Sequence, residues 1–194
     1  MKHLVLLITA LLLPFTSQAA PRSFPLDKEH TSIRFAVRYL WVSNVTGDFK
    51  KFSGTFTLDD ENIANCAVAL VIATNSVDTQ HNPTDTRLRS ENFFNVEKFP
   101  DMIFSSTSVE RTGATTAKMT GNLTLRGITK TIVLDITMSK EPNAQSAKLT
   151  PTNFSAHGTL KRSDFEMDSM MWAVGDIIEL NIATQAPLLA TPNN

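Results

Sequence analysis

Residues 125–138 read LRGITKTIVLDITM, and the second half of this stretch is the clearest secondary-structure signal in the chain. From there the side chains alternate: Ile132, Leu134, Ile136 and Met138 fall on one side, and mostly polar residues fall on the other. A period of two is typical of an extended strand, whereas a helix repeats every 3.6 residues. The stretch therefore predicts a strand with a continuous apolar face, which meets either a packed core or the wall of an apolar cavity.

The same signal recurs along most of the chain. Residues 32–39 and 52–58 alternate in the same way, whereas residues 66–77 are apolar on both faces and fit a central or covered strand. Further strands are expected over residues 102–109, 118–125, 131–138, 153–160 and 176–184. Short strands with turns between them favour an all-β fold, either closed into a barrel or folded as a sandwich.

Two irregular segments interrupt the strand signals. Residues 82–100 have a proline near their start and a capping candidate at Thr84 or Asp85, which are signals that begin a helix. We expect one or two helical turns as far as Leu88, lying over an opening of the β structure. The second irregular segment, residues 161–176, precedes the last strand.

The first 19 residues have the features of an export signal. Lys2 precedes an apolar run that is too short to span a bilayer, and Ser17 and Ala19 are the small residues that a signal peptidase needs. We expect a signal peptide over residues 1–19, one domain over residues 20–194 and a periplasmic location. Removing Lys2 from the 18 basic side chains leaves 17 against 19 acidic ones, a net charge near −2. This charge predicts no nucleic-acid partner.

The sequence contains no recognisable catalytic motif. It has no G-x-S-x-G nucleophile elbow, no H-E-x-x-H zinc motif and no glycine-rich phosphate loop. The one cysteine, Cys66, lies in an apolar strand signal, where we expect a buried, unreactive thiol. The sequence therefore predicts a binding protein rather than an enzyme, with no metal site and no required cofactor.

The second irregular segment carries Met167, Met170 and Met171, followed by Trp172. Thioethers and aromatic rings adapt to irregular apolar ligands, so these residues suit the lip of a cavity. A cluster of thioethers also suits Cu(I), although no histidine accompanies this one. The apolar lip is the favoured interpretation, and copper binding is the less favoured alternative.

Four charged residues near these segments are candidates for contact with a polar head group. Arg162 and Asp164 are two residues apart, so they could bind a ligand or form a structural ion pair with one another. Asp85 and Arg87 could close over the opening and meet a head group, or they could form a solvated helix face.

The order of several motifs resembles the YceI-like family of exported, lipocalin-like proteins. The segments that carry the resemblance are DKEHTSIRFAVRYLWVSNVTGDFKKFSGTF (27–56), TDTRLRSENFFNVEKFPDMIFSST (84–107), GNLTLRGITKTIVLDI (121–136), LKRSDFEMD (160–168) and VGDIIELNI (174–182). The resemblance implies an extended antiparallel β-barrel of eight strands with one or two short helices. Its apolar interior would hold a polyisoprenoid lipid, such as an isoprenoid quinone or a polyprenyl chain.

On this interpretation the inward faces of the strands and the two irregular segments line the cavity. Glycines beside them, such as Gly121 and Gly158, would leave room for a ligand. The expected lining residues are Phe35, Phe52, Phe56, Phe93, Phe94, Phe104, Met119, Leu123, Leu134, Ile136, Met138, Phe154, Leu160, Phe165, Met167, Met170, Met171, Trp172 and Leu180.

The chain departs from the family pattern at Tyr39, at residues 84–87 and at Glu166. These positions lie near the expected opening, so the resemblance indicates the lipid chain more strongly than the head group. The expected partner is a hydrophobic lipid that exchanges with a membrane. A structural or stress-related barrel with a filled core stays open as an alternative, as does a homodimer.

Overall fold

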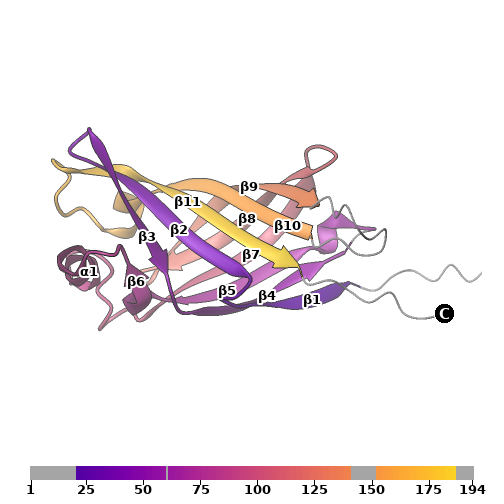
Figure 1. Ribbon diagram of the computed structural model, residues 1–194, viewed down its shortest axis with the longest axis horizontal. Coiled ribbons are helices and arrows are strands. Elements are labelled where there is room, and N and C mark those ends of the chain that lie inside the picture. The colour runs from indigo at the N-terminus through magenta and orange to yellow at the C-terminus, as the bar shows by residue number, and fades with distance from the viewer. Residues whose placement is uncertain (1–20, 60, 141–151, 187–194) are drawn as a thin grey trace, which may run out of the picture.

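The computed structural model describes residues 21–59, 61–140 and 152–186, so the export signal expected over residues 1–19 lies outside the described residues. Figure 1 shows antiparallel strands that curl around one long axis, with a helix at one end. No helix in the described part of the chain has the length and apolar character needed to cross a membrane. The strands are β1 (Arg22–Leu26), β2 (Thr31–Tyr39), β3 (Ser43–Phe49), β4 (Phe52–Leu58), β5 (Ala67–Ala73), β6 (Val77–Asp78), β7 (Asp101–Arg111), β8 (Thr116–Leu125), β9 (Ile128–Lys140), β10 (Thr152–Lys161) and β11 (Val174–Ala186). The helices found among the described residues are α1 (Asn82–Arg89) and three short 3₁₀ helices, Ile63–Asn65, Thr74–Ser76 and Arg162–Phe165.

The LRGITKTIVLDITM stretch forms the turn of the β8–β9 hairpin and most of β9. Arg126 and Gly127 are the two turn residues, and both have positive φ, 52° and 75°. Two such residues are typical of a type I′ turn, whose twist matches that of the flanking strands. Leu134 is 5% exposed, whereas Val133 is 46% exposed. The strand predicted from the alternation and its inward apolar face are both confirmed.

All of these strands belong to one antiparallel sheet, in the order β1-β4-β5-β7-β8-β9-β10-β11-β2-β3-β6. β3 and β4 lie near opposite ends of this order, yet only Lys50 and Lys51 separate them in the chain. Backbone hydrogen bonds connect this two-residue link to the segment after β5: Lys50 N–H donates to the Ser76 carbonyl at 3.1 Å, and Ala73 N–H donates to the Lys51 carbonyl at 3.0 Å. The sheet therefore curls back toward itself into a barrel-like shape, and a sandwich of two sheets does not form.

The described residues contain eleven strands, and the expected eight-stranded count is not confirmed. Short interruptions between consecutive strands account for the larger number. Asp27 Oδ1 accepts the backbone N–H groups of Glu29 and His30 between β1 and β2. Between β5 and β6, the buried Thr74 hydroxyl lies 2.8 Å from the carbonyls of both Phe99 and Pro100, outside the sheet. The all-β class and the helix expected near Leu88 are confirmed.

One end of the sheet is filled by aromatic and aliphatic side chains. Phe56 packs against Phe24 with ring centroids 6.5 Å apart, and it meets Phe154 edge to face at 4.9 Å. Met119 and Val109 are buried in the same core, with 5% and 7% of their surface exposed. We call this part, at the end opposite α1 in Figure 1, the closed end.

The turn between β4 and β5 at the closed end is organised by Asp59. Its carboxylate accepts the Asn65 side-chain N–H at 2.8 Å and the backbone N–H groups of Asn62 and Glu61 at 2.8 and 2.9 Å. The Asn65 bond is the largest influence, followed by the Asn62 N–H, and together they hold the pKa of Asp59 below its ordinary value of 3.8 despite burial. The ionised carboxylate therefore stabilises the turn.

Thermal stability is expected to fall in acid partly through this turn. Since the folded-state pKa of Asp59 lies below the unfolded value, its contribution is present above pH 3.8 and is lost as the pH falls through the folded-state value. Asp59→Asn should melt below the wild type at neutral pH and show a shallower loss of melting temperature below about pH 4. Asp101→Asn, at an exposed carboxylate, is the matched control. Parallel pH profiles for wild type and Asp59→Asn would contradict this assignment.

Candidate apolar cavity

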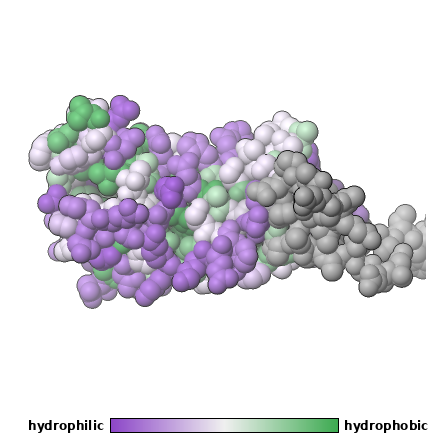
Figure 2. Space-filling model, in the orientation of Figure 1, coloured by the Kyte–Doolittle hydropathy of each residue, from purple (hydrophilic) through white to green (hydrophobic). Residues whose placement is uncertain are grey.

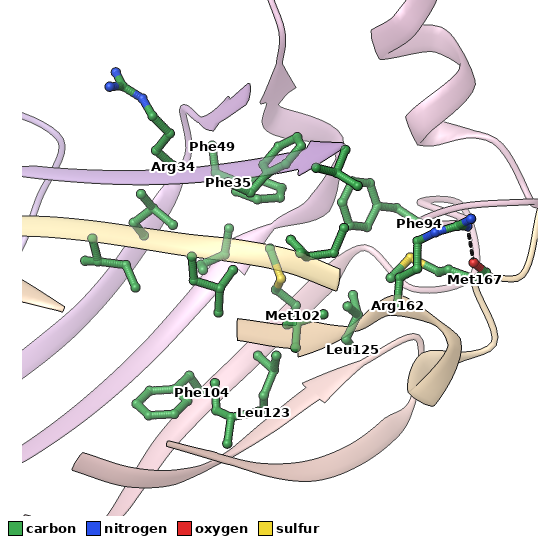
Figure 3. A pocket seen from close by; sticks show the side chains of 18 of the residues that line it. Arg34, Phe35, Phe49, Phe94, Met102, Phe104, Leu123, Leu125, Arg162 and Met167 are labelled. Carbon is green, nitrogen blue, oxygen red and sulfur yellow. Dashed lines mark hydrogen bonds between the residues drawn. The ribbon is translucent and has the colours of Figure 1, made fainter. Parts of the chain in front are cut away.

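A cavity of about 130 Å³ lies in the half of the sheet nearer α1 (Figure 3). All but two of its lining residues are apolar. The side chains come from β2, β3, β5, β7–β11, α1 and the segments that follow α1 and β10. The lining residues are Ile33, Arg34, Phe35, Val37, Phe49, Leu70, Ile72, Leu88, Phe93, Phe94, Met102, Phe104, Leu123, Leu125, Ile132, Leu134, Leu160, Arg162, Met167, Val174, Ile178, Leu180 and Ile182.

About half of the residues expected to bind a ligand line this cavity. They are Phe35, Phe93, Phe94, Phe104, Leu123, Leu134, Leu160, Met167 and Leu180. The remaining expected residues do not line it. Phe52, Phe56, Met119, Ile136, Met138, Phe154, Phe165, Met170, Met171 and Trp172 pack elsewhere in the core or lie at the surface.

Several lining residues could not be predicted from the sequence patterns described above, or were not among the residues expected to bind a ligand. Phe49 lies in β3, whose sequence SNVTGDF has too few apolar residues to give a strand signal. Leu70 and Ile72 belong to the segment that is apolar on both faces, so alternation could not show which side points inward. Ile33 and Ile178 do lie on alternating faces, and that pattern was a signal that could have identified them.

Gly121 and Gly158 do not leave free space, contrary to the expectation. A Cβ atom on Gly121 would lie 2.4 Å from the Phe104 ring and 2.8 Å from the Ser105 carbonyl oxygen. At Gly158 it would lie 2.6 Å from Leu134 Cδ2 and 2.8 Å from the Val133 carbonyl oxygen. Both glycines instead allow a large neighbour to lie across the strand, so neither is a suitable position for a cavity-filling side chain.

The end of the cavity nearest α1 is bounded by α1 and the residues after it. Phe94 N–H donates to the Leu88 carbonyl at 2.9 Å, which folds the aromatic pair Phe93 and Phe94 back under the helix. Arg126, in the β8–β9 turn, donates to the carbonyls of Glu91 and Phe93. The turn of the LRGITKTIVLDITM stretch thus helps to hold two cavity-lining rings in position.

Asp85 does not reach the cavity. Its side chain is 4% exposed and accepts the Thr79 backbone N–H at 2.8 Å and the Thr79 hydroxyl at 2.7 Å. These bonds join the first turn of α1 to the chain that follows β6. The structure therefore supports a structural role for Asp85 in place of contact with a head group.

Arg162 borders the cavity and is 2% exposed. Nε donates to the Gly175 carbonyl at 2.9 Å, Nη1 donates to the carbonyls of Met167 and Ser169, and Nη2 donates to the Val174 carbonyl at 2.9 Å. Burial lowers the pKa of Arg162, and the carboxylates of Asp176 and Asp168 oppose this shift. The guanidinium thus holds the segment between β10 and β11, which we call the 166–173 loop, in its folded shape.

The predicted pairing of Arg162 with Asp164 is not observed, because the guanidinium faces the carbonyls of the 166–173 loop while Asp164 is exposed. Arg87 is also exposed, and its Nη1 lies 3.5 Å from Met170 Sδ. Arg34, the other charged lining residue, points away from the cavity in Figure 3 and pairs with Asp48 at 3.0 Å. The side chains that face the cavity are therefore apolar.

The three methionines of the 161–176 segment do not form a shared site. Met167 is buried at the cavity, Met170 Sδ faces Arg87, and Met171 Sδ lies 2.9 Å from Arg162 Nη2. Two of the three sulfurs therefore accept from cationic side chains, an arrangement that opposes the binding of a metal cation. Within the described ranges no group of three or more His, Cys, Asp or Glu residues could hold a metal ion.

The fold and cavity define an all-β protein with an apolar cavity in one half of its sheet and a filled closed end. The sequence profile of the YceI-like domain matches residues 24–186, and the chain belongs to this family. Protein YceI from Salmonella arizonae and Salmonella dublin is 37% identical over 187 residues, which covers 95% of this chain and 96% of the relative.

Solved structures share the fold. The YceI protein of Campylobacter jejuni superposes with a TM-score of 0.68 at 31% identity and covers 79% of this chain and 90% of its own. Burkholderia cenocepacia BcnA gives a TM-score of 0.72 at 20% identity, over 81% and 96% of the two chains. A polyisoprenoid binding domain from Saccharophagus degradans gives 0.57 at 15% identity, over 81% and 94%.

Proposed function

We propose that this protein binds the hydrocarbon chain of a polyisoprenoid lipid in the apolar cavity and carries it in the periplasm. The observation that carries the proposal is the chemistry of the wall: the side chains facing the cavity are aliphatic, aromatic or thioether, and the guanidinium of Arg162 is turned toward backbone carbonyls. A wall without free polar groups favours a hydrocarbon over a polar metabolite, because a polar ligand would lose its hydrogen bonds to water. The description of the Saccharophagus degradans domain as polyisoprenoid binding supports the same class of ligand.

The volume of the cavity limits how much of such a chain can enter it. A cavity of about 130 Å³ is close in size to apolar cavities that hold a single benzene, which is about the size of one isoprene unit. A longer chain requires lining side chains to rotate. Met102 and Met167 suit this role because a thioether side chain is unbranched and adapts its shape.

We expect the protein to bind its lipid by exchanging it reversibly with a membrane. Moving a forty-carbon isoprenoid from water into the protein would release on the order of 30 kcal/mol at about 0.8 kcal/mol per carbon. This exceeds the ceiling of about 20 kcal/mol for non-covalent affinity. The relevant reference state is therefore a bilayer and not water. The free energy of transferring the isoprenoid chain from the bilayer into the apolar cavity is close to zero, because both surroundings are apolar. A carrier, unlike an enzyme, needs no further chemistry for this role.

Native mass spectrometry of the protein purified from membrane-containing cells tests the proposal. A discrete adduct whose organic extract is a long isoprenoid would support it and would identify the head group. A bare protein mass that does not change after incubation with quinone or polyprenol in detergent micelles would contradict it. The filled-core alternative, which the packing of the closed end already resembles, would then apply to the whole barrel.

A further inference from the structure

Two neighbouring loops at the α1 end of the molecule expose large apolar side chains. The β2–β3 turn carries Leu40, Trp41 and Val42, which are 43%, 71% and 87% exposed, and the 166–173 loop carries Met171 and Trp172, which are 41% and 73% exposed. We call these five residues the apolar rim. Figure 2 shows hydrophobic surface at this end of the molecule. The rim includes both tryptophans of the chain.

The rim is held in place by its backbone. Leu40 N–H donates to the Ala173 carbonyl at 2.7 Å, and Tyr39 pairs with Val174 where β2 meets β11. Leu40 and Trp41 have φ values of 49° and 64°, left-handed conformations that are unfavourable for residues with large side chains. Such conformations persist where the surrounding structure holds them and concentrate at functional positions. Large apolar residues therefore occupy two positions of the β2–β3 turn that glycine or asparagine would fill at a lower cost in stability.

The rim lies next to residues that line the cavity. Met167, in the same loop as Trp172, lines the cavity, and so does Val174 immediately after the loop. Met170 of this loop meets Arg87 of α1 through the 3.5 Å sulfur contact described above. A surface that touches the rim therefore also faces the end of the cavity bounded by α1.

The charges beside the rim indicate what kind of surface fits it. A groove of about 400 Å³ next to Trp41 is lined by three charged residues, Arg38, Asp176 and Glu179. The Asp176 carboxylate accepts hydrogen bonds from the backbone N–H and the hydroxyl of Ser163, whereas Arg38 and Glu179 are exposed on neighbouring strands with opposite charges. These two exposed charges are complementary to a zwitterionic head group, in which a phosphate and an ammonium group lie close together. Glu166 and Asp168, both exposed in the 166–173 loop, oppose an anionic surface.

We propose that the apolar rim docks on a zwitterionic phospholipid bilayer, with the two tryptophans at the boundary between head groups and acyl chains. Tryptophan favours this boundary because its ring is apolar and its indole N–H is a hydrogen-bond donor. The inference rests on the proposed function, since a bilayer is the partner that both covers the rim and holds isoprenoid chains. Docking would bring the bounded end of the cavity against the lipid phase, so that a chain could pass without crossing water.

Intrinsic fluorescence reports on the rim directly, because both tryptophans belong to it. Adding phosphatidylcholine vesicles should shift the emission to shorter wavelength, and lipids brominated near the head of the acyl chain should quench it. Trp41→Asn, which tolerates the left-handed backbone, and Trp172→Ser should each weaken co-flotation with vesicles about tenfold, and the double variant on the order of a hundredfold. Adding phosphatidylglycerol should not tighten binding.

The matched control replaces exposed apolar residues away from the rim. Ile103 and Val133 are 47% and 46% exposed on β7 and β9, so Ile103→Ser and Val133→Ser remove similar surface. Their binding to vesicles should equal that of the wild type. Three results would overturn the proposal: no spectral shift with vesicles, binding only to anionic vesicles that salt abolishes, or a dimer in solution that the double tryptophan variant dissociates.

Measurements of lipid uptake distinguish a failure of membrane docking from a failure of the proposed lipid binding. The double tryptophan variant should take up polyprenol from detergent micelles as well as the wild type does, but extract it from vesicles at least about tenfold more slowly. If the wild type takes up no lipid from micelles, the proposed function fails, while fluorescence still tests docking. Equal extraction rates for variant and wild type would exclude a role for the rim in delivery.

Discussion

Leu180→Trp is expected to abolish uptake of a polyisoprenoid while leaving the protein folded. Leu180 lines the cavity from β11, between Phe35 of β2 and Gly158 of β10, so a larger ring at this position projects into the open space. Overpacking a filled core costs about 1 to 3 kcal/mol, and open space beside the ring reduces that cost. Loading from polyprenol micelles, measured by native mass spectrometry, should fall at least tenfold, which is about 1.4 kcal/mol of binding free energy.

Val133→Trp is the matched control for this variant. It adds the same ring on the outside of β9, where Val133 is 46% exposed. The control should load lipid as the wild type does, and the two variants should melt within a few degrees of one another. Normal loading by a folded Leu180→Trp protein would mean that lipid does not occupy this cavity. This test is sharper than charge substitutions such as Leu134→Asp, which would destroy a plain core as readily as a binding site.

Arg162→Met is expected to destabilise the protein strongly. The substitution keeps much of the side-chain volume but removes the donors that meet the carbonyls of Met167, Ser169, Val174 and Gly175. Leaving buried polar groups without partners should cost about 3 to 5 kcal/mol. For a domain of this size that corresponds to a fall in melting temperature of roughly 10 °C, measured by calorimetry.

Two further substitutions test whether the lost hydrogen bonds of Arg162 cause the destabilisation of Arg162→Met. Lys161→Met changes the exposed neighbour and should alter stability by less than about 0.5 kcal/mol. Arg162→Lys retains the charge but lacks the planar fork, so it should recover only part of the lost stability. If Arg162→Lys matched the wild type, the positive charge alone would be sufficient and the network of carbonyls would be unimportant. The loosened 166–173 loop should also change the emission of Trp172.

Local sequence patterns predicted a large part of the fold. The LRGITKTIVLDITM stretch predicted a strand, and that strand is present because alternation acts over a few neighbouring positions. β3 escaped prediction because Gly47, Asp48 and Asn44 dilute its apolar signal, and it forms through pairing with β2. The breaks that divide the strands depend on contacts such as Thr74 with Phe99 and Pro100, which are more than twenty positions distant.

The candidate site was predicted less completely. Alternation tells which side chains point inward but not how far along the barrel each one lies, so Phe104 and Phe56 looked equivalent. Only the folded sheet places Phe104 at the cavity and Phe56 in the closed end. The role of Arg162 likewise depends on carbonyls five to thirteen positions later in the chain, which no spacing rule connects to it.

Patterns in the amino-acid sequence were sufficient to predict the all-β class, the inward faces of most strands and the relationship to the YceI-like family. The strand count, the division of the interior into cavity and closed end, and the exposure of Trp41 and Trp172 became visible only in the folded structure. The difference lies in how far apart in the chain the interacting residues are. Strand periodicity and turn chemistry are properties of adjacent residues, whereas a cavity or an exposed rim exists only where segments distant in the chain meet, or fail to meet, in space.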